Sequence, residues 1–142
     1  MTLMSARLPT ASVPRSDSPY SAALSPHCFL IARSNDNLKA LEQWVAKTPW
    51  AGFLAKDAVI RSNTSVCIAI TDPAFVQLAE DAKAEKIKKM CSILEKEGAA
   101  LDIAGYRAAP PGLRIWCGAT VDTADIEALA PWLDWAWRQV KG

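Results

Sequence analysis

Apolar residues recur at three- and four-residue steps in three parts of the chain, which is the spacing of one buried helix face. The first part lies at about residues 30–48 and ends at a proline, which disfavours helix in the residue before it. The second covers residues 81–97, where Gly98 is placed to end the helix. The third covers residues 123–141 and contains Pro131. We therefore expect three helices, the last of them kinked or broken into two at Pro131.

Other apolar segments predict strands. Residues 65–70 are apolar on both alternating faces, which is typical of a strand covered on both sides. Residues 113–117 form a second apolar run, and residues 101–103 indicate a short third strand. Residues 50–54 are expected to form an apolar connector. This order predicts an α+β fold, with a small mixed or antiparallel sheet of about three strands and helices packed on one face.

Residues 1–28 differ in composition from the rest of the chain. They hold four of the nine prolines and many serines, and their apolar residues follow neither helical nor strand spacing. Such a segment cannot bury enough apolar surface to offset the entropy lost on ordering. We expect a disordered leader at residues 1–28 and a single domain at residues 29–142.

The composition limits the classes of partner. The chain has 16 basic and 15 acidic residues and a net charge of +1, so nothing favours nucleic acid as a partner. No apolar run approaches the roughly 20 residues that a membrane-spanning helix needs. The four cysteines form no C-x-x-C pair and His27 is the single histidine, which argues against a metal site. Reduced thiols are typical of cytoplasmic proteins, and we expect that location.

The residues alone offer no catalytic group. Residues 29–142 lack histidine and the common phosphate-binding and hydrolase motifs, and most lysines fall on polar helix faces. Arginine is left. Alternation along its strand places Arg114 on the same face as Trp116. Arg114 either pairs with a surface acid, a contact worth only about 0–1 kcal/mol, or binds a planar carboxylate or phosphate. Composition favours the ion pair. Asp102 is the one acid inside an expected strand, where an edge-strand charge is the simpler interpretation.

Longer stretches carry a family resemblance. The runs "NTSVCIAITDPAF", "LEKEGAALDIAGYRAAPPGLRIWCGATV" and "DIEALAPWLDWAW" closely resemble the C-terminal end of phosphoserine aminotransferases of the type found in alpha-proteobacteria and some archaea. The run "LIARSNDNLKALEQWVAKTPWAGFLA" resembles the segment just upstream in that family. The resemblance covers about four-fifths of the chain, from near Leu30 onward, and leaves out residues 1–28.

The resemblance implies a definite activity for the full-length family. Its members are fold-type-I, class V aminotransferases that use pyridoxal 5′-phosphate and work as homodimers. They transfer an amino group from glutamate to 3-phosphohydroxypyruvate in serine synthesis and, in some bacteria, pyridoxine synthesis. By motif, Arg114 matches the arginine that holds the substrate α-carboxylate. Tyr106 and Arg107 occupy the place of a His-Arg pair that contacts the substrate phosphate, although tyrosine replaces the histidine.

The family's large domain has no counterpart in this sequence. No lysine matches the Schiff-base motif, so the resemblance implies no catalytic or cofactor-binding residue here. We expect a truncated small domain that binds substrate anions, is inactive alone, and has a large domain and a homodimer partner in the full-length family. One alternative remains open: a stand-alone α+β interaction module in which Trp132, Trp135 and Trp137 of the last helix form a partner-binding surface.

Overall fold

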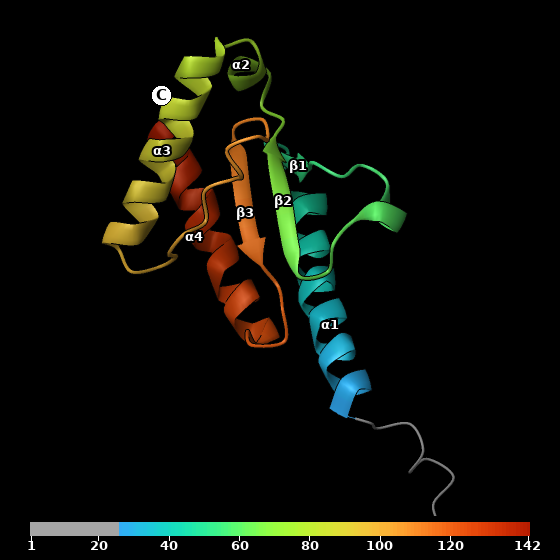
Figure 1. Ribbon diagram of the computed structural model, residues 1–142. Coiled ribbons are helices and arrows are strands. Elements are labelled where there is room, and N and C mark those ends of the chain that lie inside the picture. The colour runs from blue at the N-terminus through green and yellow to red at the C-terminus, as the bar shows by residue number, and fades with distance from the viewer. Residues whose placement is uncertain (1–25) are drawn as a thin grey trace, which may run out of the picture.

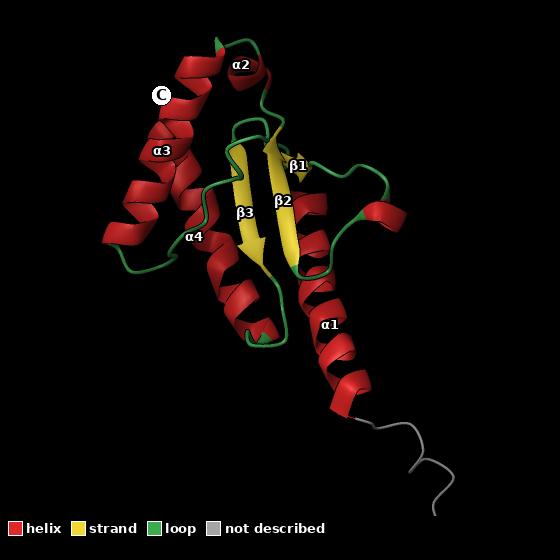
Figure 2. Ribbon diagram, viewed as in Figure 1, coloured by secondary structure: helices red, strands yellow, loops and turns green. Residues whose placement is uncertain are grey.

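The structure, a computed structural model, describes residues 26–142. Three strands form one sheet, and long helices pack against it (Figure 1). In chain order the elements are α1 (Pro26–Lys47), β1 (Ala51–Phe53), a 3-10 turn η2 (Ala58–Ile60), β2 (Ser65–Ile70), α2 (Pro73–Val76), α3 (Glu80–Lys96), β3 (Gly112–Trp116) and α4 (Thr123–Lys141). Figure 2 shows the sheet with α1 and α4 behind it and α3 to the side of β3, which confirms the expected α+β fold.

The sheet is antiparallel and has the order β1-β2-β3, with β2 in the centre. Along β2, Val66, Ile68 and Ile70 are buried, while the residues between them are only partly covered. This two-residue period places the helices against one face and leaves the other face partly open. The expectation that residues 65–70 are covered on both sides is therefore wrong. The second face is also apolar in sequence, and small residues on it such as Cys67 border a hollow beside the turn before β3.

Two short segments differ from the sequence-based prediction. Residues 101–103 do not form a strand, and only Ala104 makes an isolated bridge, to Leu113 of β3. Asp102 has a φ of 52°, in the left-handed region, which interrupts the extended backbone. Conversely, the expected connector at residues 50–54 contains strand β1. A strand of three residues is too short for its period to be recognised in a sequence.

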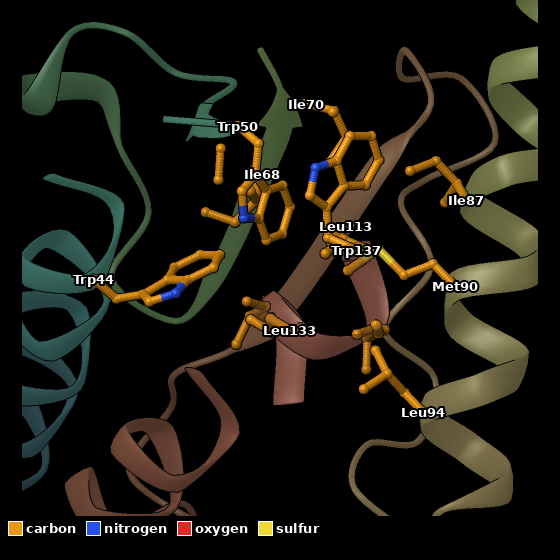
Figure 3. Close-up of a cluster of buried hydrophobic side chains, with 14 of the residues drawn as sticks. Trp44, Trp50, Ile68, Ile70, Ile87, Met90, Leu94, Leu113, Leu133 and Trp137 are labelled. Carbon is orange, nitrogen blue, oxygen red and sulfur yellow. The ribbon is translucent and has the colours of Figure 1, made fainter. Parts of the chain in front are cut away.

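The hydrophobic core lies between the sheet and the helices (Figure 3). The rings of Trp50 and Trp137 are stacked with centroids 5.1 Å apart, and Trp44 packs edge-on against Trp50 at 5.5 Å. Asp134 accepts the indole N–H of Trp44 at 3.2 Å and that of Trp50 at 3.0 Å. Because buried aromatic rings remove much apolar area from water, this cluster is a main link between α1, α4 and the start of β1.

Helix α4 is a single helix that contains Pro131. The predicted break into two helices is therefore wrong. A proline inside a helix removes a backbone hydrogen bond and costs about 3 kcal/mol. However, Ile126 before it and Leu133 and Trp137 after it are all buried in the same core. Their burial offsets the cost of the proline and keeps the helix continuous.

A buried amide joins α1 to the loop that follows β3. The Asn37 side chain is fully buried, and its Nδ2 lies 3.1 Å from the carbonyl oxygen of Cys117 and 3.3 Å from that of Gly118. The same nitrogen donates to the Val121 carbonyl oxygen at 2.9 Å. The Asn37 Oδ1 accepts the Thr123 hydroxyl at 2.7 Å. One side chain thus supplies hydrogen bonds to the whole connection from β3 into α4.

The expected boundary between leader and domain falls inside α1. This helix begins at Pro26, so residues 26–28 of the expected leader are helical, and residues 1–25 lie outside the described part of the chain. The division into leader and domain stays a prediction. Within residues 26–142, no helix combines the length and apolar character needed to cross a membrane.

Replacing Asn37 with leucine should lower the free energy of unfolding by about 2–4 kcal/mol, because buried carbonyl groups lose their donor. Urea unfolding followed by circular dichroism measures this change. Asn35→Leu is the matched control, since Asn35 is exposed on the same helix and its side-chain oxygen accepts from Asn63 at 2.9 Å. We expect the control to change stability by less than about 0.5 kcal/mol. Equal effects of the two substitutions would contradict the role given to Asn37.

Burial raises the pKa of the Cys91 and Cys117 thiols to about 11. At pH 8 only about 0.1% of each is the reactive thiolate. We expect iodoacetamide at this pH to alkylate the exposed Cys28 first and to leave Cys91 and Cys117 unmodified until the protein unfolds. Mass spectrometry of tryptic peptides gives the order of modification. Early alkylation of Cys117 in the folded protein would argue against its burial.

Candidate functional site

Arg114 lies in the middle of β3, on the partly open face of the sheet. Leu113 and Ile115 on either side of it are buried in the core. The strand period therefore sends Arg114 and Trp116 to the opposite face, as the sequence predicts. Cys67 of β2 is the cross-strand partner of Arg114. The guanidinium thus starts from a rigid strand and extends over the face that the helices do not cover.

Tyr106 lies against Arg114. The central carbon of the guanidinium is 5.0 Å from the centroid of the Tyr106 ring, which is a cation–π contact. The Tyr106 hydroxyl lies 2.9 Å from the Ser65 hydroxyl at the start of β2. The aromatic ring is therefore tied to β2 through its hydroxyl and presents its face to the arginine on β3.

The loop before β3 brings Tyr106 to this position. The N–H of Gly105 donates to the Gly112 carbonyl oxygen at 3.0 Å, which closes the loop between them. Gly112 ends the Pro-Pro-Gly turn and has no room for a side chain, because a Cβ there would lie 2.4 Å from the Ile68 carbonyl oxygen. Since the two prolines fix their own φ, the turn is stiff. Tyr106 is consequently held next to the strand that carries Arg114.

Tyr106 and Arg114 stabilise each other's charged forms. The hydrogen bond with Ser65, followed by the interaction with Arg114, lowers the pKa of Tyr106 below its ordinary value. The interaction with the Tyr106 hydroxyl and the nearby charge of Asp102 raise the pKa of Arg114. Arg114 is therefore a permanent cation at every pH at which the protein is studied.

Arg114 also forms a surface ion pair. Its Nη2 donates to Asp102 Oδ2 at 2.9 Å and lies 3.4 Å from the Asp102 carbonyl oxygen. The Asp102 side chain is 87% exposed and that of Arg114 is 29% exposed, so this pair contributes only about 0–1 kcal/mol to stability. The predicted pairing of Arg114 with a surface acid is confirmed, with Asp102 as the acid, and a role of Arg114 in binding an anion stays a prediction. The sequence did not predict this pairing because Asp102 lies in a turn and not in the expected strand.

Arg107 does not join this pair. It is exposed and borders a groove of about 500 Å³ between α3 and the loop before β3. Arg114 borders a different cavity of about 360 Å³. Tyr106 lines the first groove and also contacts Arg114. The structure therefore brings Tyr106 and Arg114 together and places Arg107 on the adjacent groove.

Trp116 borders the cavity beside Arg114. Its side chain is 54% exposed, yet its orientation is fixed, because Nε1 donates to Thr120 Oγ1 at 3.0 Å. Gly118 packs against the indole so closely that a Cβ there would lie 2.4 Å from the ring carbon Cζ2. The sequence patterns did not single out Thr120 or Gly118, since loop residues have no periodic signal.

The tryptophans of α4 do not form one surface. Trp137 is 3% exposed and stacks on Trp50 inside the core. Trp132 is 40% exposed and packs edge-on against Trp135 at 5.6 Å. The alternative of a partner-binding surface is therefore wrong in including Trp137, because helical spacing turns this residue toward the sheet with Leu133.

The cavity beside Arg114 does not fit pyridoxal phosphate. No lysine borders the Arg114 cavity, and no described lysine is buried. Lys83 pairs with Glu80 and Lys141 with Asp72, each at 2.9 Å or less. Within residues 26–142, no three His, Cys, Asp or Glu side chains are grouped so that they could hold a metal. A Schiff base needs a lysine beside the reacting carbon of the substrate; Lys88 borders the neighbouring groove, and none of the described lysines borders the Arg114 cavity.

Comparison with known proteins identifies relatives of the chain. No family model matches it. It is 48% identical over 112 residues to a phosphoserine aminotransferase of Methanosarcina barkeri, and 46% identical over 112 residues to one of Methanosarcina mazei. Each match covers 79% of this chain but only 28% of the relative, so the chain spans less than a third of the length of these relatives. The chain is therefore related to the phosphoserine aminotransferases, as its motifs predict, and matches a part of them that is consistent with their C-terminal region.

Proposed function

We propose that this chain is the substrate-anion-binding part of a phosphoserine aminotransferase, which converts glutamate and 3-phosphohydroxypyruvate to 2-oxoglutarate and phosphoserine. The observation that carries the proposal is the Arg114 guanidinium held 5.0 Å from the Tyr106 ring centroid on the accessible face of the sheet. The identity of 48% to a curated member supports it. The activity of the whole enzyme, its place in serine synthesis and its cytoplasmic location belong to the same proposal.

Arg114 binds the α-carboxylate of the substrate. A guanidinium and a carboxylate are both planar, so two parallel N–H···O bonds fix their relative orientation as well as balancing charge. The Tyr106 ring restricts the arginine to one position, which reduces the conformational entropy lost on binding. The ordered indole of Trp116 borders the same cavity and limits the orientations that a ligand can adopt there.

Arg107 and Tyr106 bind the phosphate. Arg107 is exposed on the groove beside α3, and Lys88 and Glu95 of α3 border the same groove, so two cations and one carboxylate face it. Tyr106 supplies a hydroxyl donor at the position where the family has histidine. Because Tyr106 borders this groove and contacts Arg114, it joins the phosphate position to the carboxylate position.

The amino transfer itself requires the rest of the enzyme. Pyridoxal 5′-phosphate supplies the electron sink for this chemistry, and the lysine that carries it belongs to the large domain. The first turns of α1 project past the end of the sheet (Figure 1), with Phe29, Leu30 and Ile31 about half exposed. Val59 and Ile60 of η2 are still more exposed. We infer that the large domain or the homodimer partner covers such apolar surface in the whole enzyme, and that this chain alone is inactive.

Arg114→Gln should weaken the binding of O-phospho-L-serine by about 10- to 100-fold, because a charge-assisted pair is worth about 1.5–3 kcal/mol. Titration of the labelled chain followed by NMR measures the affinity. L-Serine carries the carboxylate without the phosphate, so Arg114→Gln should also abolish its binding. Arg107→Gln should weaken phosphoserine binding but leave L-serine binding unchanged.

Arg138→Gln is the matched control, since Arg138 is exposed on α4 and does not border the Arg114 cavity. It removes the same charge and should bind both ligands as the unmodified chain does. If Arg114→Gln binds phosphoserine as tightly as Arg138→Gln, then Arg114 is not the carboxylate-binding residue. If Arg107→Gln weakens both ligands equally, the assignment of the phosphate to Arg107 fails.

A further inference from the structure

We propose that the Asp102 side chain competes with the substrate for the Arg114 guanidinium. Asp102 occupies the place of the substrate carboxylate and leaves when the substrate binds. This inference rests on the proposed function, in which Arg114 binds that carboxylate. The observation behind it is the 2.9 Å contact between Asp102 Oδ2 and Arg114 Nη2, which lies beside the cavity of about 360 Å³. Nothing in the proposed function by itself requires an acid at this position.

Asp102 engages the nitrogen that every two-point contact needs. A planar carboxylate can form two parallel hydrogen bonds with a guanidinium either at Nε and Nη2 or at Nη1 and Nη2. Nη2 is common to both edges. In the structure this nitrogen donates to the Asp102 carboxylate at 2.9 Å and lies 3.4 Å from the carbonyl oxygen of the same residue. Because Nη2 carries two hydrogens, one on each edge, the Asp102 carboxylate takes one of the two edges from a ligand, and that edge becomes available when Asp102 leaves.

The ion pair is easily exchanged for a ligand. Asp102 engages Nη2 through one carboxylate oxygen, and its side chain is 87% exposed, so water and salt screen the attraction. A substrate carboxylate that forms two parallel bonds replaces one such contact with two. The exchange moves a single exposed side chain, because the contact with the Tyr106 ring holds the arginine independently of Asp102.

The backbone keeps Asp102 ready to return. Its φ of 52° lies in the left-handed region, which aspartate and asparagine tolerate better than other residues with side chains. The next residues are fixed to β3, because Arg114 N–H donates to the Ile103 carbonyl oxygen at 2.8 Å and Ala104 bridges Leu113. Asp102 is thus a tethered carboxylate with a high local concentration. It disfavours anions that cannot form both bonds, and so it acts as a specificity-determining residue.

The test is the affinity of the full 142-residue chain for O-phospho-L-serine, measured by NMR titration. Asp102→Asn removes the charge, keeps the shape and tolerates the same φ. It should bind about two- to fivefold more tightly than the unmodified chain. Glu85→Gln makes the same change of charge on the exposed side of α3 and should leave the affinity unchanged. An unchanged, weakened or undetectable affinity of Asp102→Asn overturns the proposal.

Arg114→Lys distinguishes competition for the planar edge of Arg114 from simple repulsion between the Asp102 charge and the anionic ligand, because lysine keeps the positive charge but has no planar edge. Asp102→Asn should bring little or no gain in an Arg114→Lys background. An equal gain in both backgrounds would show that Asp102 acts only through its charge, and would overturn the proposal. The proposed function has its own readout: it fails if Arg114→Lys binds phosphoserine as tightly as the unmodified chain does. If Arg114→Lys binds phosphoserine weakly and Asp102→Asn brings no gain in the chain that keeps Arg114, only the competitor role fails.

Discussion

The two-residue period of β3 determines where the candidate site lies. Leu113 and Ile115 are 1% and 3% exposed in the core, and each burial is worth about 1.5–3 kcal/mol. A register shift of one residue would expose both and bury the Arg114 guanidinium without a partner, which is costly. The core therefore forces Arg114 and Trp116 onto the face that the helices leave open. The position of the cation is a consequence of packing on the other side of the strand.

The connections on both sides of β3 complete the site. Before the strand, the Pro-Pro-Gly turn and the tight approach of Gly112 to Ile68 place Tyr106 against Arg114. After the strand, Asn37 of α1 holds the carbonyl groups of the loop that supplies Thr120 to Trp116. Rigid elements thus fix the direction of the arginine, and two loops supply the groups around it. A partly exposed cation held this way is suited to a ligand that arrives from solvent.

Periodicity in the sequence predicted the elements that have a long buried face. The helices α1, α3 and α4 and the strands β2 and β3 all lie where apolar spacing predicted them. The predictions failed where the signal was short or local. β1 has three residues, and Asp102 adopts a left-handed φ that no pattern reveals. Pro131 was expected to kink α4 or break it into two helices; the break is absent because burial on both sides of the proline outweighs its cost.

For the site, alternation predicted the face of Arg114 but not its neighbours. Its contacts with Tyr106 and Asp102 depend on a loop whose path is not periodic, and motif resemblance alone suggested roles for the residues. A crystal structure of this chain with O-phospho-L-serine bound would test the central claim most directly. We predict that the ligand carboxylate bonds to two nitrogens of Arg114, with the Asp102 side chain turned away. A ligand bound elsewhere, with the Arg114–Asp102 pair intact, would contradict it.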